Sequence, residues 1–214
     1  MAIAKMEIGA EFGKGWRLFQ ANMGVLIVGG ILMAVVSAVT CGLLSGPLMV
    51  GLLLMAQRLL KNDPVKPQAG DVFKGFDSFV QALLLMVIVI VAVMVLSMLP
   101  IIGQLASLVV SAVMMWALAF IAFEKATAVD AIKKVFELTK SGEFTVPLVF
   151  AVIASLVGGL GAIACGIGVF FTLPLTYCLM ACCYETLFSG EPEVIEPVKE
   201  QAPPPPPPAD DLRL

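Results

Sequence analysis

Residues 78–123 read SFVQALLLMVIVIVAVMVLSMLPIIGQLASLVVSAVMMWALAFIAF, a run of 46 residues without Asp, Glu, Lys or Arg. A helix crosses the hydrocarbon core of a bilayer in about 20 residues, so this run is long enough for two crossings. Two further charge-free runs, 18–57 and 144–184, contain 40 and 41 residues. The sequence therefore predicts an all-α membrane protein with six transmembrane helices arranged as three hairpins.

The composition agrees with membrane insertion. Of the 214 residues, 60% are apolar, whereas soluble domains contain about 45–50% apolar residues. The formal net charge is −3, and the basic residues form no dense run of the kind that follows a nucleic-acid backbone. We therefore expect the lipid bilayer, and no nucleic acid, as a partner.

The six predicted crossings are 23–40, 43–60, 82–99, 105–123, 146–164 and 170–188. Residues 23–60 would give only about 57 Å of helix at 1.5 Å per residue, which is barely two crossings of ~30 Å. A re-entrant first hairpin is therefore the alternative for that segment.

Three lysines, each followed two residues later by an aromatic residue, recur at intervals of 60 residues: Lys14 and Trp16, Lys74 and Phe76, Lys134 and Phe136. The recurrence predicts three units, about 5–60, 70–123 and 128–188, each opened by an amphipathic lead-in helix. The predicted apolar faces are Ile8, Phe12, Trp16 and Phe19; Val72, Phe76 and Phe79; and Val129, Ile132 and Phe136. Such helices would lie in the membrane interface with the lysines and aromatic residues as anchors. Packing on the protein's own bundle is the alternative, and coincidence is the alternative to a true repeat.

All 13 lysines and arginines lie outside the charge-free runs, and the hairpins predicted at 41–46, 100–104 and 165–168 contain none. Six crossings place every charged segment on one side, which the positive-inside rule makes cytoplasmic. Both termini are then cytoplasmic. We expect Glu124, Tyr184 and Glu185 to be solvated at cytoplasmic helix ends.

Small residues recur every four positions at Ala154, Gly158, Ala162 and Gly166. In lipid this spacing lets two helix backbones approach closely, which predicts a packing seam toward the bundle or toward a second copy. The chain has five cysteines and no histidine. We interpret the cysteines as small apolar packing residues, with a disulfide between Cys41 and Cys165 as the alternative.

The predicted crossings contain no Asp, Glu, Lys, Arg or His apart from Arg58 near the end of the second and Glu185 near the end of the sixth, whereas membrane catalysis ordinarily uses such groups. The sequence therefore predicts no enzyme, cofactor or metal. It favours a scaffold or accessory subunit of a larger membrane complex, which implies a membrane-protein partner or a homo-oligomer. The alternative is a small-solute or lipid transporter that uses the interface between units. Its candidate polar residues are Gln81, Gln104, Ser107, Ser111 and Thr172.

Residues 1–188 form the predicted membrane domain, and 189–214 form an acidic, proline-rich cytoplasmic tail with six consecutive prolines at 203–208. This composition predicts disorder, with the prolines as a stiff polyproline II spacer. A ligand for a cytoplasmic partner at 203–214 is the alternative.

The segment TAVDAIKKVFELTKSGEF (127–144), the CGIG of 165–168, Pro174 and the late pair Tyr184 and Glu185 carry a resemblance. Over about residues 10–188 the chain resembles poorly characterised bacterial six-span membrane proteins of the DUF975 and glycerophosphodiester phosphodiesterase membrane-domain families. The resemblance implies a helical fold in a bacterial inner membrane. It implies no catalytic residue, and it does not extend to a phosphodiesterase domain or to the proline-rich tail.

Overall fold

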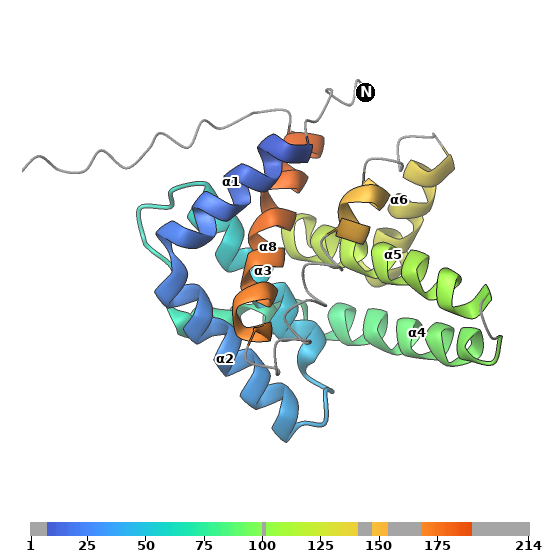
Figure 1. Ribbon diagram of the computed structural model, residues 1–214. Coiled ribbons are helices and arrows are strands. Elements are labelled where there is room, and N and C mark those ends of the chain that lie inside the picture. The colour runs from blue at the N-terminus through green and yellow to red at the C-terminus, as the bar shows by residue number, and fades with distance from the viewer. Residues whose placement is uncertain (1–7, 100–101, 141–146, 154–167, 190–214) are drawn as a thin grey trace, which may run out of the picture.

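The computed structural model describes residues 8–99, 102–140, 147–153 and 168–189. Every regular element in these ranges is a helix, which confirms the all-α prediction (Figure 1). The elements are α1 (Ile8–Ala21), α2 (Met23–Val39), α3 (Ser45–Leu60), the 3-10 helix η1 (Ala69–Ser78), α4 (Phe79–Ser97), α5 (Ile102–Glu124), α6 (Ala128–Lys140), a helical segment at 147–153, α8 (Val169–Tyr184) and the π-helical η2 (Glu185–Ser189).

Fewer of these helices meet the requirements for a membrane crossing than the six predicted. In the described residues, Ala69–Ser97 and Val169–Phe188 are long and apolar enough, and α1 with α2 makes a third if this pair, bent by 88°, is one span. Helix α3 has 16 residues, or about 24 Å at 1.5 Å per residue, which is short of a ~30 Å core. Most of the fifth predicted crossing, 146–164, lies outside the described residues. The fold is compatible with a membrane location.

The first hairpin turns at residues 40–44. Cys41 and Gly42 both have positive φ, 50° and 82°, and the Gly42 backbone N–H donates to the Ser37 carbonyl at 2.7 Å. A glycine accepts this left-handed conformation without the steric cost that a side chain brings, so the chain can reverse within a few residues. The turn lies where the sequence predicts it, between α2 and α3.

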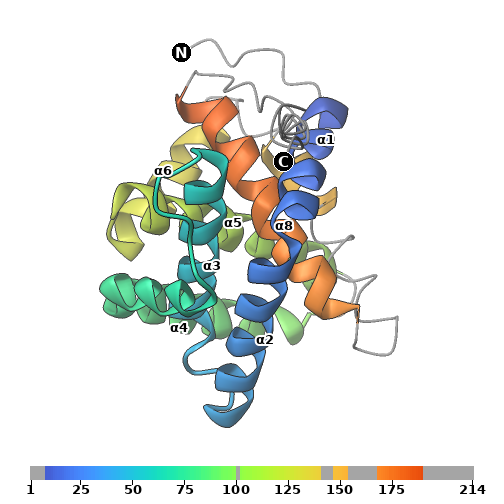
Figure 2. The ribbon, with the colours of Figure 1, turned by 90° about the vertical axis from the view of Figure 1, so that its left-hand side faces the viewer.

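Each lead-in element packs on the last long helix of another unit. Helix α1 packs on α8, η1 packs on α3, and α6 packs on α5. Figures 1 and 2 both show α1 lying alongside α8, so the first lead-in meets the last long helix. The three lead-ins thus join the units in a closed cycle.

Helices α3, α5 and α8 carry the core. Trp116 of α5 is completely buried and its indole N–H donates to the Pro147 carbonyl at 3.0 Å. The Trp116 ring contacts Phe150 and Phe188, with ring centroids 6.4 and 5.9 Å away. One side chain therefore joins α5 to the 147–153 segment and to η2.

Helices α4 and α5 lie side by side and extend away from the rest of the bundle (Figure 1). Only Ala82 and Leu85 of α4 are buried. Val93, Met94 and Val95 are consecutive and all exposed, and consecutive helical positions point in different directions around the axis. Helix α4 is therefore apolar on every side, and the sides that do not contact α5 are largely uncovered by the protein itself.

Candidate membrane-interface site

The first lead-in docks on the bundle through residues that, apart from Phe19, lie outside its predicted apolar face. Helix α1 buries Glu11, Gly15, Leu18 and Phe19, whereas Trp16 is 43% exposed. A Cβ atom at Gly15 would lie 2.6 Å from Leu179 Cδ2. The helix approaches α8 so closely that the small residue determines the docking face, and the side chain of Trp16 remains outside the contact.

The second lead-in is a 3-10 helix of ten residues. The residues that share one of its faces therefore differ from those expected for an α-helix. At three residues per turn, positions i and i+3 are in register. Val72, Gly75 and Ser78 accordingly form the buried row. The predicted grouping of Val72 with Phe76 and Phe79, which assumed α-helical spacing, is therefore wrong.

The neighbouring row of η1 is aromatic. The ring centroids of Phe73 and Phe76 are 6.1 Å apart, and those of Phe76 and Phe79 are 5.8 Å apart with an interplanar angle of 9°. Phe73 is exposed and the other two are partly buried. This stack is a consequence of the i, i+3 register and gives the lead-in a partly open aromatic edge.

The third lead-in repeats this division of faces. Helix α6 buries Ala128, Ala131 and Val135, while Val129 is 49% and Phe136 61% exposed. The predicted apolar face of α6 therefore points largely away from the docking contact. Across the three lead-ins, the buried positions Gly15, Gly75 and Val135 retain the spacing of 60 residues.

The first two lead-ins join their following helices at different angles. Helix α1 meets α2 at 88°, whereas η1 and α4 run together as one 29-residue helix. The difference goes against strict structural equivalence of the first two units. All three lead-ins dock on a long helix of another predicted unit. They differ in the direction in which the chain continues after the lead-in.

All three recurring lysines have carboxylate partners. Lys14 pairs with Glu11 at 2.8 Å and Lys74 with Asp71 at 3.0 Å, each three residues back in the chain. Lys134 pairs with Glu124. Anchoring of these lysines and of Trp16, Phe76 and Phe136 in lipid headgroups stays a prediction.

The carboxylate of Glu124 joins three helices. Its Oε1 accepts a hydrogen bond from the Tyr184 hydroxyl of α8 at 2.6 Å, and its Oε2 accepts one from Lys134 of α6. Partial burial raises the pKa of Glu124, but the hydrogen bonds from Lys134 and Tyr184 and the lysine charge outweigh it, so the pKa lies below its ordinary value of 4.5. The Glu124 side chain is 36% exposed, as expected of a solvated helix end, but it also ties three helices together.

Because the folded pKa of Glu124 is lowered, its contribution to stability is present above about pH 4.5 and is lost as the pH falls through the folded pKa. We expect Glu124→Gln to lower the thermal midpoint at pH 7 by an amount equivalent to less than about 1 kcal/mol, since the site is partly solvated. The difference from wild type should shrink toward pH 4. Glu137→Gln is the control, because it removes an exposed carboxylate from α6, the helix that carries Lys134. A difference that does not change with pH would contradict the assignment.

Glu185 makes an equivalent junction between α3 and the end of α8. Its Oε1 accepts a hydrogen bond from Gln57 Nε2 at 2.7 Å and lies 2.9 Å from the Lys61 amino group. Its side chain is only 13% exposed. The expected solvation of Glu185 is therefore wrong, because this carboxylate forms a tie between helices.

Three of the polar residues predicted for a transport pathway form hydrogen bonds within the protein. Gln81 Oε1 accepts the Ala128 N–H at 2.9 Å and so caps the start of α6. The Ser111 hydroxyl donates to the Ser107 carbonyl at 2.8 Å, and the Thr172 hydroxyl donates to the Gly168 carbonyl at 3.1 Å. The Gln104 side chain lies outside the described residues.

A cavity of about 160 Å³ lies between α3, α5 and α8. Its lining is mostly apolar and includes Met49, Met114, Met115 and Met180, with Ser111 as one of few polar residues. Of the predicted transport residues, Gln81 and Thr172 do not line it. This arrangement suits an apolar occupant better than an ion or a sugar.

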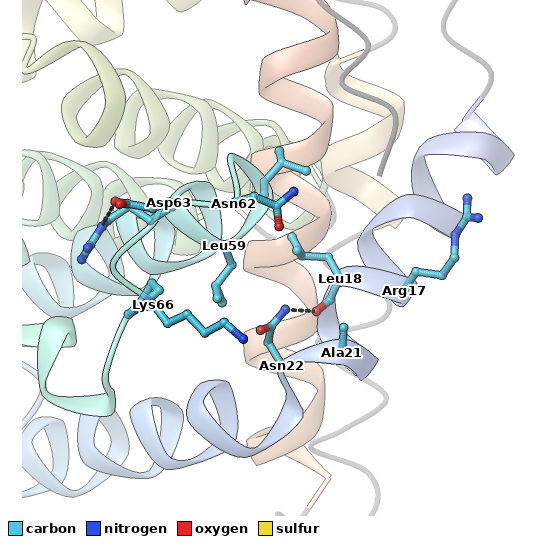
Figure 3. A pocket seen from close by; sticks show the side chains of 11 residues that line it. Arg17, Leu18, Ala21, Asn22, Leu59, Asn62, Asp63 and Lys66 are labelled. Atoms are coloured by element: carbon cyan, nitrogen blue, oxygen red, sulfur yellow. Dashed lines mark hydrogen bonds and ion pairs between the residues drawn. The ribbon is translucent and has the colours of Figure 1, made fainter. Parts of the chain in front are cut away.

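A second cavity, of about 210 Å³, lies at the bend between α1 and α2 (Figure 3). Arg17, Arg58 and Lys66 are its cationic residues and Asp63 is its acidic one. Arg58 holds the loop that closes one side: Nε lies 2.8 Å from Asp63 Oδ2, and a terminal nitrogen donates to the Val65 carbonyl at 3.0 Å. The other terminal nitrogen lies 2.7 Å from Asp71 Oδ2.

The predicted packing seam Ala154, Gly158, Ala162 and Gly166 lies outside the described residues, as do Cys165 and the tail at 190–214. Of the described cysteines, Cys41 is exposed, and Cys178, Cys182 and Cys183 are buried. Burial on α8 agrees with their interpretation as packing residues.

The sequence did not indicate the junction of Glu124 with Tyr184, although a signal for it was present. Tyr184 follows Glu124 by 60 residues, the same interval that separates the lysines, so the two occupy corresponding positions at the ends of α5 and α8. Glu11 is also buried, with 3% of its surface exposed. No periodic signal marks it.

Comparison with family models, with curated proteins and with solved structures found no match for this chain.

Proposed function

We propose that this protein is a non-catalytic scaffold or accessory subunit of a larger complex in a bacterial inner membrane. The observation that carries the proposal is α4, which packs on α5 along one side and leaves most of its other apolar side chains exposed. A helix that is apolar all round needs lipid or apolar protein around it. The sides of α4 that do not contact the bundle are therefore available to a membrane-protein partner or a second copy.

The charged residues support a structural role. The carboxylates of Asp71, Glu124 and Glu185 each bind groups from other segments or helices. In these three places the groups that acid–base chemistry would need are engaged in holding the bundle together. We also propose that the 189–214 tail is a cytoplasmic spacer, which would carry residues 203–214 toward a cytoplasmic partner.

The proposal includes six crossings in three hairpins, each with an interfacial lead-in, and cytoplasmic termini. Its support is the placement of all 13 basic residues outside the charge-free runs. The short α2 and α3 leave a re-entrant first hairpin as the alternative.

This topology predicts that single cysteines at opposite ends of the helices react from opposite sides of the membrane. In a Cys-free background, Met98→Cys should label from the periplasm and Lys133→Cys from the cytoplasm. Met98 is 80% exposed, whereas a side chain at Gly103 would meet the Leu96 carbonyl at 1.9 Å. Accessibility to an impermeant maleimide, before and after permeabilisation, is the measurement. Labelling of both positions from one side would contradict six crossings.

The scaffold role is tested by purification at native expression levels in mild detergent. We expect a stoichiometric membrane protein or a second copy to remain bound. Val91→Trp and Met94→Trp on the exposed part of α4 should release it, and Val35→Trp, an equally exposed change on α2, should not. Monodisperse protein without a partner would count against the scaffold, and equal release by all three variants would exclude α4 as the contact.

A second candidate is a transporter for a lipid or small apolar solute, favoured only by the cavity between α3, α5 and α8. It requires access from water or from the bilayer to the interior of the cavity, which Leu53 lines with 1% of its surface exposed. Reaction of Leu53→Cys with a water-soluble thiol reagent in the folded protein would support it. Protection of that cysteine would leave the cavity as a packing void.

A further inference from the structure

The cavity of about 160 Å³ between α3, α5 and α8 lies along the middle of these helices. Its lining comes from residues 49–53 of α3, 111–118 of α5 and 173–180 of α8, and none of these stretches is a helix end. In a membrane-inserted protein the middle of a spanning helix lies within the hydrocarbon core. An occupant of this cavity is therefore a lipid-soluble molecule.

One side of the cavity is closed by buried side chains. Leu53, Leu118 and Met180 line it with 1%, 4% and 1% of their surfaces exposed. Ser111 also lines it but is exposed, so it marks the side on which the cavity meets the surface. A molecule that enters beside Ser111 would place its inner end against the three buried side chains.

The volume and the methionines of the cavity suit a single planar ring. An engineered apolar cavity of about 150 Å³ binds benzene, whereas whole drug-sized ligands occupy ~300–1,000 Å³. The thioether of methionine adapts to the shape of an occupant and makes favourable contacts with aromatic rings. Four methionines line this one cavity: Met49, Met114, Met115 and Met180.

The lining also contains a polar group that the protein leaves unused. The Ser111 and Thr176 hydroxyls each donate to a carbonyl of their own helix at 2.8 Å. The half-buried Tyr177 makes no hydrogen bond through its hydroxyl within the parts of the chain that the structure describes. A tyrosine hydroxyl enclosed by protein ordinarily has a partner. Tyr177 can therefore donate to a carbonyl oxygen of a bound molecule.

We propose that this cavity binds a planar six-membered ring that carries a carbonyl oxygen, the chemistry of a quinone headgroup. The Tyr177 hydroxyl donates to the carbonyl, the methionines surround the ring, and the rest of the molecule extends past Ser111 into the bilayer. The inference deepens the second candidate function and rests on the membrane location of the proposed function. It requires binding only, and neither transport nor the scaffold role.

The test is fluorine nuclear magnetic resonance of the full chain in lipid nanodiscs, with para-fluoroacetophenone as the probe. The matched compound is para-fluoro-α-methylstyrene, which has a methylene group in place of the carbonyl oxygen. Wild type should bind one molecule of the ketone more tightly than the alkene, beyond the signal of empty nanodiscs. Tyr177→Phe removes only the hydroxyl, so it should weaken binding of the ketone about fivefold and leave binding of the alkene unchanged.

A second variant fills the cavity. Leu53→Phe should weaken binding of both compounds by more than about tenfold, because a close-packed interior leaves no room for a ring. Leu84→Phe is the matched control, since Leu84 is 42% exposed on α4 and does not line the cavity. If Leu53→Phe fails to fold, the milder Tyr177→Phe still decides the question.

Absence of saturable binding to wild type would overturn the site, as would undiminished binding to folded Leu53→Phe. Equal affinity of wild type for the ketone and the alkene would overturn the carbonyl ligand, and undiminished ketone binding to Tyr177→Phe would overturn the role of Tyr177. Resistance to extraction with alkaline carbonate measures membrane insertion separately. Its failure in wild type would count against the membrane location, whereas loss of ring binding in an inserted protein would count against the cavity alone.

Discussion

Gly75→Ala is expected to separate η1 from α3 and to destabilise the protein by about 3 kcal/mol or more, at the upper end of what overpacking costs. A Cβ atom at Gly75 would lie 1.9 Å from the Pro47 carbonyl oxygen and 2.4 Å from the Gly51 nitrogen. Both obstacles are backbone atoms, which cannot move aside by a change of rotamer. The two helices would have to move apart, and the burial of Val72 in their interface would be lost with them.

The reciprocal change, Gly51→Ala, should have a similar effect, because its Cβ would lie 1.7 Å from the Val72 carbonyl oxygen. Gly70→Ala is the matched control in the same 3-10 helix, since no atom lies within 4 Å of its added Cβ. We expect that control to change the free energy of unfolding by less than about 0.5 kcal/mol. Unfolding in mixed micelles, followed by near-ultraviolet circular dichroism, measures all three. Similar midpoints for Gly75→Ala and Gly70→Ala would show that η1 is not docked so closely.

Trp116→Ala is expected to lower the free energy of unfolding by about 3–5 kcal/mol, the usual range for removing a buried aromatic side chain. The ring is fully buried and contacts Phe150 and Phe188. Its removal leaves a cavity at the point where α5 meets two other segments. The lost hydrogen bond also leaves the Pro147 carbonyl without the indole donor.

Trp116→Phe is the milder variant. It keeps an aromatic ring in the core but removes the indole N–H and part of the ring volume, so the expected loss is smaller, about 1–3 kcal/mol. Trp16→Ala serves as the control for removing an indole from a surface, because Trp16 is 43% exposed and does not lie on the docking face. The same unfolding measurement applies. Equal midpoints for Trp116→Ala and Trp16→Ala would contradict the central role given to Trp116.

The sequence predicts where helices occur better than it predicts how they pack. Apolar runs and the Gly and Pro residues between them are local signals, so α2, α4 and α8 lie close to their predicted ranges. The number of crossings is less secure, because α3 has 16 residues and falls near the length limit for a span. Length alone cannot decide such cases.

The docking faces of the lead-in elements could not be predicted from the sequence, for a physical reason. The prediction placed the bulky residues Trp16 and Phe136 toward the membrane interface and named no residues for the opposite, docking face, which close packing of backbones fills with glycine and small residues. Gly15 and Gly75 occupy these contacts. The 3-10 geometry of η1 could not be predicted from its local sequence either. Its buried residues pack on α3, more than 20 residues earlier in the chain.

The contacts of Glu124 at the candidate site could not be predicted from the sequence either. A carboxylate at the end of an apolar helix is ordinarily hydrated, and nothing nearby in the sequence indicates otherwise. Its partners Lys134 and Tyr184 come from α6 and α8, so the junction exists only after three helices have assembled. Ties between distant segments of this kind require the fold before they can be recognised.

The docking of α1 on α8 has a consequence for biosynthesis. Helix α1 is translated first, but Leu179, which Gly15 contacts, lies more than 160 residues later in the chain. At ~5–20 residues per second the ribosome needs roughly 8–30 s to make the segment between them. During that interval the docking face of α1 has no partner from its own chain. The first helix can therefore dock only after α8, near the end of the chain, has been synthesised.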